Sequence, residues 1–272
     1  MRNKDIRLAI AGLGAIGLRV AKAVDRGEVA GVTLTAVSAN DREAASERVA
    51  GFSNPPQVLP LSELADHADV IVECAPAAVF RDVAEPAIVR GLTFMPLSVG
   101  ALLAAPELVD QARETGAQIV VPTGAIIGLD TMRAMAVGEI HEVTLQTRKP
   151  PNGLAGARHL VENDIDVSGL SEPLMVFKGS ARDAAQGFPA NVNVAAALGL
   201  AGIGVDRTQV EVWADPTIDR NFHRVSVTSD SGEASMTIRN IPSKENPKTG
   251  LIVANSVIAT LHRLTAPLVA GS

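Results

Sequence analysis

Three glycines near the N-terminus have the clearest chemical meaning in this chain. Gly12, Gly14 and Gly17 form the pattern Gly-x-Gly-x-x-Gly between an apolar strand pattern and a helical pattern. Such glycines permit a tight turn, close approach of the backbone to a pyrophosphate, and close packing of the helix on the strand. The segment therefore predicts a binding site for NAD or NADP, with the phosphates at the positive end of a helix. The predicted cofactor contacts here are Gly12, Gly14, Ala15, Ile16 and Gly17.

The choice between NAD and NADP depends on the residues that follow the second predicted strand, 32–38. An acidic residue is expected about 20 positions beyond the glycines, but the sequence there runs Ala-Asn-Asp41-Arg42. Asp41 can hold the ribose hydroxyls, whereas Ser38 and Arg42 can hold a 2′-phosphate. Asp41 can equally be the N-cap of a helix, with Arg42 solvated. The sequence leaves both cofactors open.

Proton transfer needs a group other than tyrosine, because the chain contains none. His223 is the best candidate, since it follows a polar turn at the start of a predicted strand. An imidazole there can exchange a proton with an amine, a water or a hydroxyl while hydride leaves the adjacent carbon. We expect the other four histidines to be structural or solvated, with His159 in an irregular stretch; they are His67, His141, His159 and His262.

The single cysteine, Cys74, lies at the carboxyl end of a predicted strand, where ligands bind in parallel α/β sheets. A nucleophilic thiol would need an activating neighbour and access, and the sequence shows neither. We interpret Cys74 as a buried structural residue. No metal site is expected.

Further candidates lie at predicted helix starts. Asn191 and Asn193 stand at the mouth of a small-residue helix, where one is an N-cap and either can face an anionic substrate or the nicotinamide carboxamide. Ala125, in a segment flanked by glycines, can offer backbone groups to the nicotinamide. Lys248 and Thr249 bring a cation and a hydroxyl to the last helix.

A second group of cations lies at Arg148-Lys149-Pro-Pro, near a strand end. Most of the cations at these strand and helix ends are expected to be solvated. One or two of them are expected to clamp a carboxylate.

Strands alternate with helices as far as Pro122, which predicts a doubly wound parallel sheet. The predicted strands after the first are 32–38, 70–74, 93–98 and 118–121, and the helices are 41–49, 62–67 (capped by Ser62), 77–90 and 106–115.

Beyond Pro122, alternation of apolar and polar residues predicts a mostly antiparallel sheet with helical cover, hence a smaller α+β domain. Its predicted strands are 142–148, 174–178, 208–214, 222–228 and 234–239, with helices at 129–137 and 192–201. We therefore expect a dinucleotide-binding domain at 1–122 and a substrate domain at 123–247, with a cleft between them. A last helix, 248–264 within the segment 248–272, is expected to pack back on the first domain.

Composition bounds the partners of the chain. Its 272 residues carry a net charge of −6, and they lack the basic clusters that a nucleic-acid surface needs. No apolar run is long enough to span a membrane, and Asp5 interrupts any secretory signal. With one cysteine and no internal disulfide, the cytoplasm is the expected compartment.

Taken together, these segments resemble the L-aspartate dehydrogenase family over nearly the whole chain. The resemblance implies that His223 is the active-site histidine and that Ala125 and Asn193 contact the cofactor. It also implies oxidation of L-aspartate to iminosuccinate with NAD or NADP, in some organisms feeding NAD biosynthesis. We further expect a homo-oligomer such as a homodimer. The matching segments are 12–17, 98–101, 124–126, 148–151, 179–182, 191–196, 200–204, 214–216, 221–224 and 246–249.

Iminosuccinate would hydrolyse to oxaloacetate and ammonia, or be formed from them in reductive amination. Two alternatives stay open. One is a dehydrogenase of another small amino acid or a semialdehyde on the same plan. The other is a non-catalytic redox sensor, which would need the glycines but neither His223 nor the cations.

Overall fold

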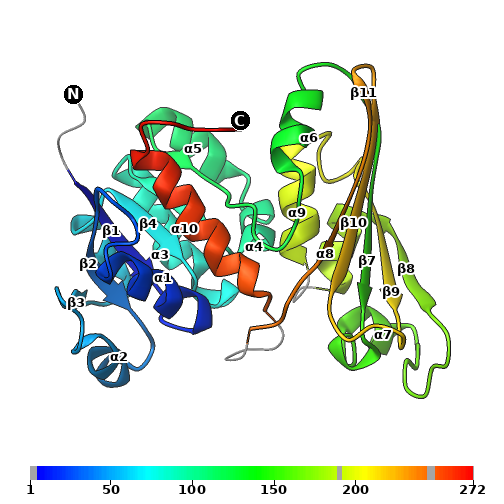
Figure 1. Cartoon of the computed structure of the whole chain (residues 1–272), viewed down its shortest axis with the longest axis horizontal. Coiled ribbons are helices and arrows are strands. Elements are labelled where there is room, and N and C mark those ends of the chain that lie inside the picture. The colour runs from blue at the N-terminus through cyan, green and yellow to red at the C-terminus, as the bar shows by residue number, and fades with distance from the viewer. Residues whose placement is uncertain (1–4, 189–191, 244–248, 272) are drawn as a thin grey trace. The chain divides into compact units, whose positions relative to one another are not determined.

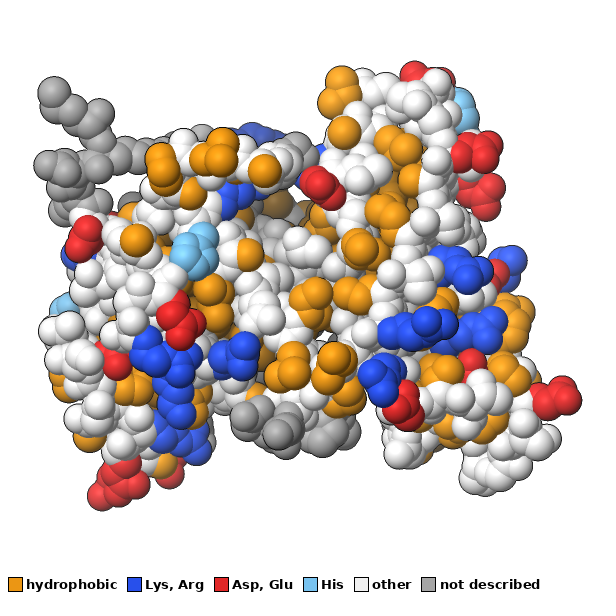
Figure 2. Space-filling view, in the orientation of Figure 1, with side chains coloured by type: hydrophobic (Ala, Val, Ile, Leu, Met, Phe, Trp, Pro, Cys, Tyr) orange, Lys and Arg blue, Asp and Glu red, His pale blue; other side chains and the backbone are white. Residues whose placement is uncertain are grey.

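The computed structural model describes residues 5–188, 192–243 and 249–271. The chain divides into two compact units, residues 1–122 with 253–269 and residues 123–252 with 270–272. The first unit is therefore assembled from two separate stretches of sequence (Figure 1). None of the helices in the described ranges is long and apolar enough to cross a bilayer. Hydrophobic and charged side chains both lie on the molecular face drawn in Figure 2.

The first unit contains a six-stranded sheet in the order β3-β2-β1-β4-β5-β6, with every pairing parallel. The order reverses at β1, and ligands of such sheets bind beyond the carboxyl ends of the strands at that point. The predicted doubly wound fold is confirmed. The strands are β1 (Ile6–Ala11), β2 (Val32–Ser38), β3 (Gln57–Val58), β4 (Val70–Glu73), β5 (Thr93–Pro96) and β6 (Gln118–Ile119).

Helices cover both faces of this sheet, and the side chains of β1 pack against both layers because successive residues point to opposite faces. Leu8 and Ile10 belong to a core cluster with residues of α1 and α10, whereas Ala9 and Ala11 belong to one with residues of α3 and α5. The helices are α1 (Ala15–Asp25), α2 (Arg42–Val49), α3 (Phe80–Val89), α4 (Val99–Leu103), α5 (Glu107–Thr115) and α10 (Leu251–Thr265), with 3₁₀ turns η1 (Leu61–Asp66) and η2 (Ala77–Val79).

The second unit contains a five-stranded sheet in the order β11-β10-β7-β9-β8. Only β7 and β9 pair in parallel, which confirms a mostly antiparallel sheet. Helices α6, α8 and α9 lie on one face of it (Figure 1). The elements are β7 (Ile140–Lys149), β8 (Leu174–Ser180), β9 (Gln209–Ala214), β10 (Phe222–Ser229), β11 (Gly232–Arg239), α6 (Leu129–Met135), α7 (Arg158–Glu162), α8 (Ala181–Gly187), α9 (Val192–Ala201) and the 3₁₀ turn η3 (Pro151–Gly153).

One edge of the second sheet gathers several strand ends. The last residue of β7, Lys149, is opposite Ala214, the last residue of β9. Next to them β10 begins at Phe222, which is opposite Arg239, the last residue of β11. The loops that leave this edge therefore converge on one region.

Three local predictions are wrong. Ser62 is not a helix cap, because the segment is a 3₁₀ turn whose hydrogen bonds, such as that from the Glu63 N–H to the Pro60 carbonyl, span three residues. The helix expected from residue 77 begins at Phe80, after the turn η2. His159 lies in α7 rather than in an irregular stretch, and the centroid of its ring is 5.4 Å from that of the Phe188 ring.

Candidate functional site

The glycine segment forms a cradle with an open side. Gly12 has φ +97°, and a Cβ there would lie 2.6 Å from the Cys74 carbonyl oxygen. A Cβ on Gly17 would lie 1.9 Å from the carbonyl oxygen of Gly12. At Gly14, by contrast, no described atom lies within 4 Å of the Cβ position. The packing of the chain requires the outer two glycines, whereas the space beside Gly14 is available to a ligand.

Helix α1 begins directly after this open side. Gly14 is its N-cap and has no side chain to bond the first amides, while the half-buried Ala15 and Ile16 form the first turn. These amides lack partners within the helix, so an anion beside Gly14 would accept hydrogen bonds from them. The residues present therefore fit a dinucleotide pyrophosphate.

The end of β2 shows the capping role expected of Asp41. Its Oδ1 accepts the Ala44 N–H at 2.9 Å, and both Asp41 and Arg42 are exposed at the start of α2. Ser38 is buried, and its carbonyl accepts the Gly12 N–H at 2.7 Å. The cap is compatible with either cofactor.

Sequence reasoning missed Glu73, a fully buried carboxylate at the carboxyl end of β4. It accepts the Ser98 N–H at 2.9 Å and the Ser98 hydroxyl at 3.0 Å. Burial raises the pKa of Glu73, and the hydrogen bonds from Ser98 oppose this rise. These hydrogen bonds connect the end of β4 to Ser98, which follows β5, beside the cradle. The available signal was a charged residue ending the apolar run Val-Ile-Val.

The neighbouring Cys74 has the properties of a structural thiol. Burial raises its pKa well above the usual value, and the adjacent Glu73 adds to the rise. Since the thiolate is the nucleophile, this environment makes Cys74 inert near neutral pH.

His223 is buried at the start of β10, with only 3% of its surface exposed. Its partner across the sheet is Thr147 of β7, whose Oγ1 lies 3.1 Å from Nδ1 of the ring. Burial, together with the positive charge of Lys149, lowers the pKa of His223 to about 3. The imidazole is therefore neutral at pH 7, and its contact with Thr147 helps to fix the orientation of the ring.

The two cations at the end of β7 lie on opposite faces of the sheet. Arg148 stacks on the Trp213 ring and pairs with the buried Asp215 at 3.2 Å. Lys149, two residues beyond Thr147, shares the face of His223 and is 8% exposed. Burial lowers the pKa of Lys149 to about 8. The predicted carboxylate clamp can thus be Lys149 but not Arg148, although sequence reasoning did not place Lys149 among the site residues.

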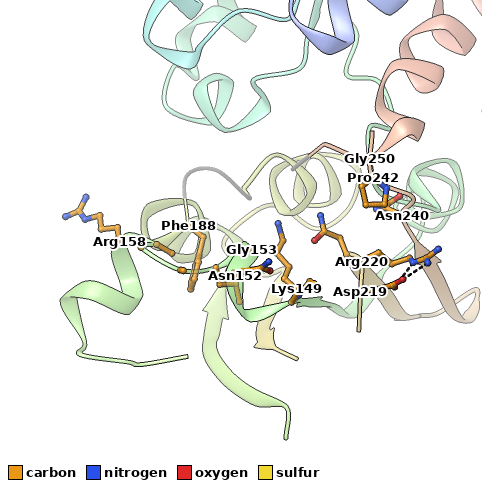
Figure 3. Close-up of a pocket in the computed structure, with 16 residues that line it drawn as sticks. Lys149, Asn152, Gly153, Arg158, Phe188, Asp219, Arg220, Asn240, Pro242 and Gly250 are labelled. Carbon is orange, nitrogen blue, oxygen red and sulfur yellow. Dashed lines mark hydrogen bonds and ion pairs between the residues drawn. The ribbon is translucent and has the colours of Figure 1, made fainter. Parts of the chain in front are cut away.

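A pocket of about 640 Å³ opens at this edge of the second sheet. Figure 3 shows the Lys149 side chain extended into it, with Asn152 and Arg158 on one side and Asp219 and Arg220 on the other. The wall combines cationic and amide groups with small and apolar residues. It is lined by Lys149, Pro150, Asn152, Gly153, Leu154, Ala155, Gly156, Ala157, Arg158, Phe188, Asp219, Arg220, Asn221, Asn240, Pro242 and Gly250.

Asn240 connects this wall to Ala125. Its Nδ2 donates to the Ala125 carbonyl at 3.0 Å, and because a carbonyl can only accept, Oδ1 must be the atom on the other side of the amide. That Oδ1 is buried and has no hydrogen-bond partner among the described residues. A buried acceptor without a donor costs about 1–3 kcal/mol, which a ligand N–H would recover.

The structure brings the remaining predicted site residues together less closely. Thr249 is half-buried next to the pocket residue Gly250, and its carbonyl accepts the Ser243 N–H at 2.7 Å. Asn193 is exposed on the first turn of α9. Asn191 and Lys248 lie outside the described residues. Within the described ranges, no group of three or more His, Cys, Asp or Glu side chains is arranged to hold a metal ion.

Comparison with known proteins agrees with both units. Residues 130–264 match the family described as "Aspartate dehydrogenase, C-terminal", and residues 12–122 match "Homoserine dehydrogenase, NAD binding domain". The chain is 53% identical to the L-aspartate dehydrogenase of Bradyrhizobium diazoefficiens, over 99% of this chain and 95% of that one. The chain belongs to the L-aspartate dehydrogenase family.

Other relatives extend this result. L-aspartate dehydrogenase 3 of Bordetella bronchiseptica is 51% identical over 99% of both chains. The crystal structure of aspartate dehydrogenase from Thermotoga maritima has a TM-score of 0.74 and 23% identity, covering 98% of this chain and 99% of that one, which shows the shared fold. As a member of this family, the chain is an NAD(P)-dependent oxidoreductase of the amino-acid dehydrogenase type.

Replacing Gly14 with Ala is expected to weaken binding of NAD or NADP without destabilising the fold. The new Cβ meets no protein atom, but it occupies the space that the phosphates need. Fluorescence titration with coenzyme and urea unfolding measure the two effects. Gly51→Ala is the matched control, because Gly51 also has open space around its Cβ position. Unchanged affinity in Gly14→Ala would contradict the cradle.

Replacing His223 with Asn is expected to make stability less dependent on pH. Unfolded imidazole has a pKa near 6.5 and the folded value is about 3, so the unfolded state binds more protons between these values. The native protein therefore loses stability as pH falls through this range, and His223 contributes about 2 kcal/mol of that loss by pH 5. Urea unfolding at pH 7 and pH 5 measures it.

His141→Asn serves as the control for this experiment, because His141 is exposed on β7. The stability of His141→Asn should depend on pH in the same way as that of the native protein. Equal pH dependence in His223→Asn and the native protein would contradict the buried, neutral state of His223.

Proposed function

We propose that this protein oxidises L-aspartate to iminosuccinate, with NAD or NADP as hydride acceptor. The observation that carries the proposal is the buried, neutral His223 at a sheet edge where cationic and amide side chains line a pocket. The relatives named L-aspartate dehydrogenase support the choice of substrate.

The pocket wall suits a small dicarboxylic amino acid. The guanidinium of Arg220 and the amides of Asn152 and Asn221 can donate hydrogen bonds to carboxylates. Oδ1 of Asn240 offers the acceptor that an ammonium or imine N–H requires.

The role of His223 in the reaction is that of a base. The neutral imidazole takes a proton from the substrate ammonium, so that the nitrogen lone pair can form the C=N bond as hydride leaves C2. The bound nicotinamide coenzyme supplies the hydride acceptor. Thr147 keeps the ring in one orientation during this transfer.

The bound substrate also makes His223 a stronger base. Burial and a neighbouring positive charge lower the pKa of His223, and a dicarboxylate brings negative charge that favours the protonated form. Water then adds to the imine, and ammonia leaves to give oxaloacetate. The reverse sequence is reductive amination.

The finer contacts are part of the same proposal. Asp41 or Arg42 discriminates between the ribose hydroxyls of NAD and the 2′-phosphate of NADP, and Ala125 and Asn193 contact the nicotinamide. The substrate-binding set is completed by Asn191, Lys248 and Thr249.

The composition of the chain also bears on its cellular setting. The single cysteine supports a cytoplasmic location. We further propose that the chain forms a homodimer. Iminosuccinate would feed NAD biosynthesis where the host uses that route. A monomeric mass in sedimentation equilibrium would remove the dimer from this proposal.

The native protein is expected to reduce NAD or NADP when given L-aspartate, followed by the absorbance of the reduced nicotinamide. His223→Ala should lower kcat about 10²–10⁴-fold, because it removes the proton acceptor, while coenzyme affinity stays near the native value. His141→Ala is the control. Reduction driven by another amino acid or a semialdehyde but not by L-aspartate would overturn the substrate, and joint loss of turnover and coenzyme binding in His223→Ala would overturn the role of His223.

A further inference from the structure

We propose that Lys149 is the residue that binds a carboxylate of L-aspartate and places the substrate against His223. This inference rests on the proposed function and assigns a specific residue to one half of substrate recognition.

The position of Lys149 follows from the register of two strands. Thr147 is directly opposite His223, and Lys149 is the next residue of β7 on the same face. Diagonal neighbours of this kind lie about 7 Å apart at their Cβ atoms, which is close enough for one small molecule to contact both side chains. Figure 3 shows the Lys149 side chain directed into the pocket rather than along the strand.

The other cations of the described pocket wall differ from Lys149 in burial. Arg158 pairs with Glu162 at 2.7 Å, and Arg220 pairs with Asp219 at 2.7 Å. Their side chains are 66% and 40% exposed, so both ion pairs are well solvated. Among the described lining residues, Lys149 is the one buried cation. A carboxylate that enters the pocket would therefore meet its strongest, least screened positive charge at Lys149.

A carboxylate on Lys149 would also act on His223. The ammonium is one of the two causes that lower the pKa of His223. Among the described lining residues, the other charged groups are Asp219, Arg220 and Arg158, which pair in part with one another or with Glu162. Neutralising Lys149 by a substrate carboxylate would therefore raise the proton affinity of His223 at the moment when the base is needed.

The decisive variant is Lys149→Met, which keeps the aliphatic stem and removes the charge. We expect the KM for L-aspartate to rise about 10- to 100-fold, because a hydrogen bond to a charged group is lost. Binding of succinate, a dicarboxylate without the amine, should weaken by a similar factor in calorimetry with saturating coenzyme. Lys149→Arg should recover part of both. Lys178→Met is the control, since Lys178 is an exposed lysine of the same sheet that pairs with Glu211.

The native protein offers a second test that needs no substitution. The pKa of Lys149 is about 8, so in the absence of substrate its ammonium loses its proton between pH 7 and pH 9. Succinate affinity should then fall about tenfold over this range. Affinity that stays constant over this range would overturn the inference even if Lys149→Met does not fold.

The two proposals fail in distinguishable ways. A native protein without turnover of L-aspartate overturns the proposed function. An active native protein whose KM and succinate affinity are unchanged in Lys149→Met overturns the role of Lys149 and leaves the proposed function intact.

Discussion

The alternation of side chains at the end of β7 is the constraint on which the candidate site depends. Arg148 turns to the outer face and joins Asp215 and Trp213, while Lys149 turns to the face of His223. A slip of one residue would exchange these two cations and place Arg148 in the helix-covered core. The ion pair with Asp215 on one face and the Thr147 contact on the other therefore fix one register together.

Burial of two basic side chains destabilises the folded protein, but it also prepares the site for its chemistry. His223 and Lys149 both have lowered pKa values because the interior disfavours their charged forms. Unlike an exposed cation, a base in such surroundings responds strongly to an incoming negative charge, since little water screens the two. The same environment that destabilises the resting fold makes the site sensitive to a dicarboxylate.

The predictability of each feature from sequence depends on how local its cause is. The glycine cradle and the Asp41 cap depend on a few consecutive residues, and both are recognisable in the sequence. Lys149 and Glu73 could not be recognised in this way, because the importance of Lys149 arises from strand register and that of Glu73 from hydrogen bonds with Ser98, at the start of α4.

Two further elements show the limits of local patterns. The two-residue strand β3 is too short for any periodicity. Helix α8 was missed although its capping box, Ser180 with Asp183, is a local signal, because its small residues resemble a loop. The cap of α8 can be recognised in the sequence, whereas its apolar face is recognisable only from its packing against the neighbouring helix α9.

Helix α10 supplies Ala254, Val257 and Leu261 to a core whose other members precede residue 96. A ribosome therefore completes the substrate unit before it releases the segment that finishes the coenzyme unit. Until then, the apolar residues that α10 covers stay exposed in the nascent coenzyme unit. Chaperone capture during synthesis would thus favour the earlier half of the polypeptide, and a gene fragment encoding that half alone would yield an aggregation-prone product.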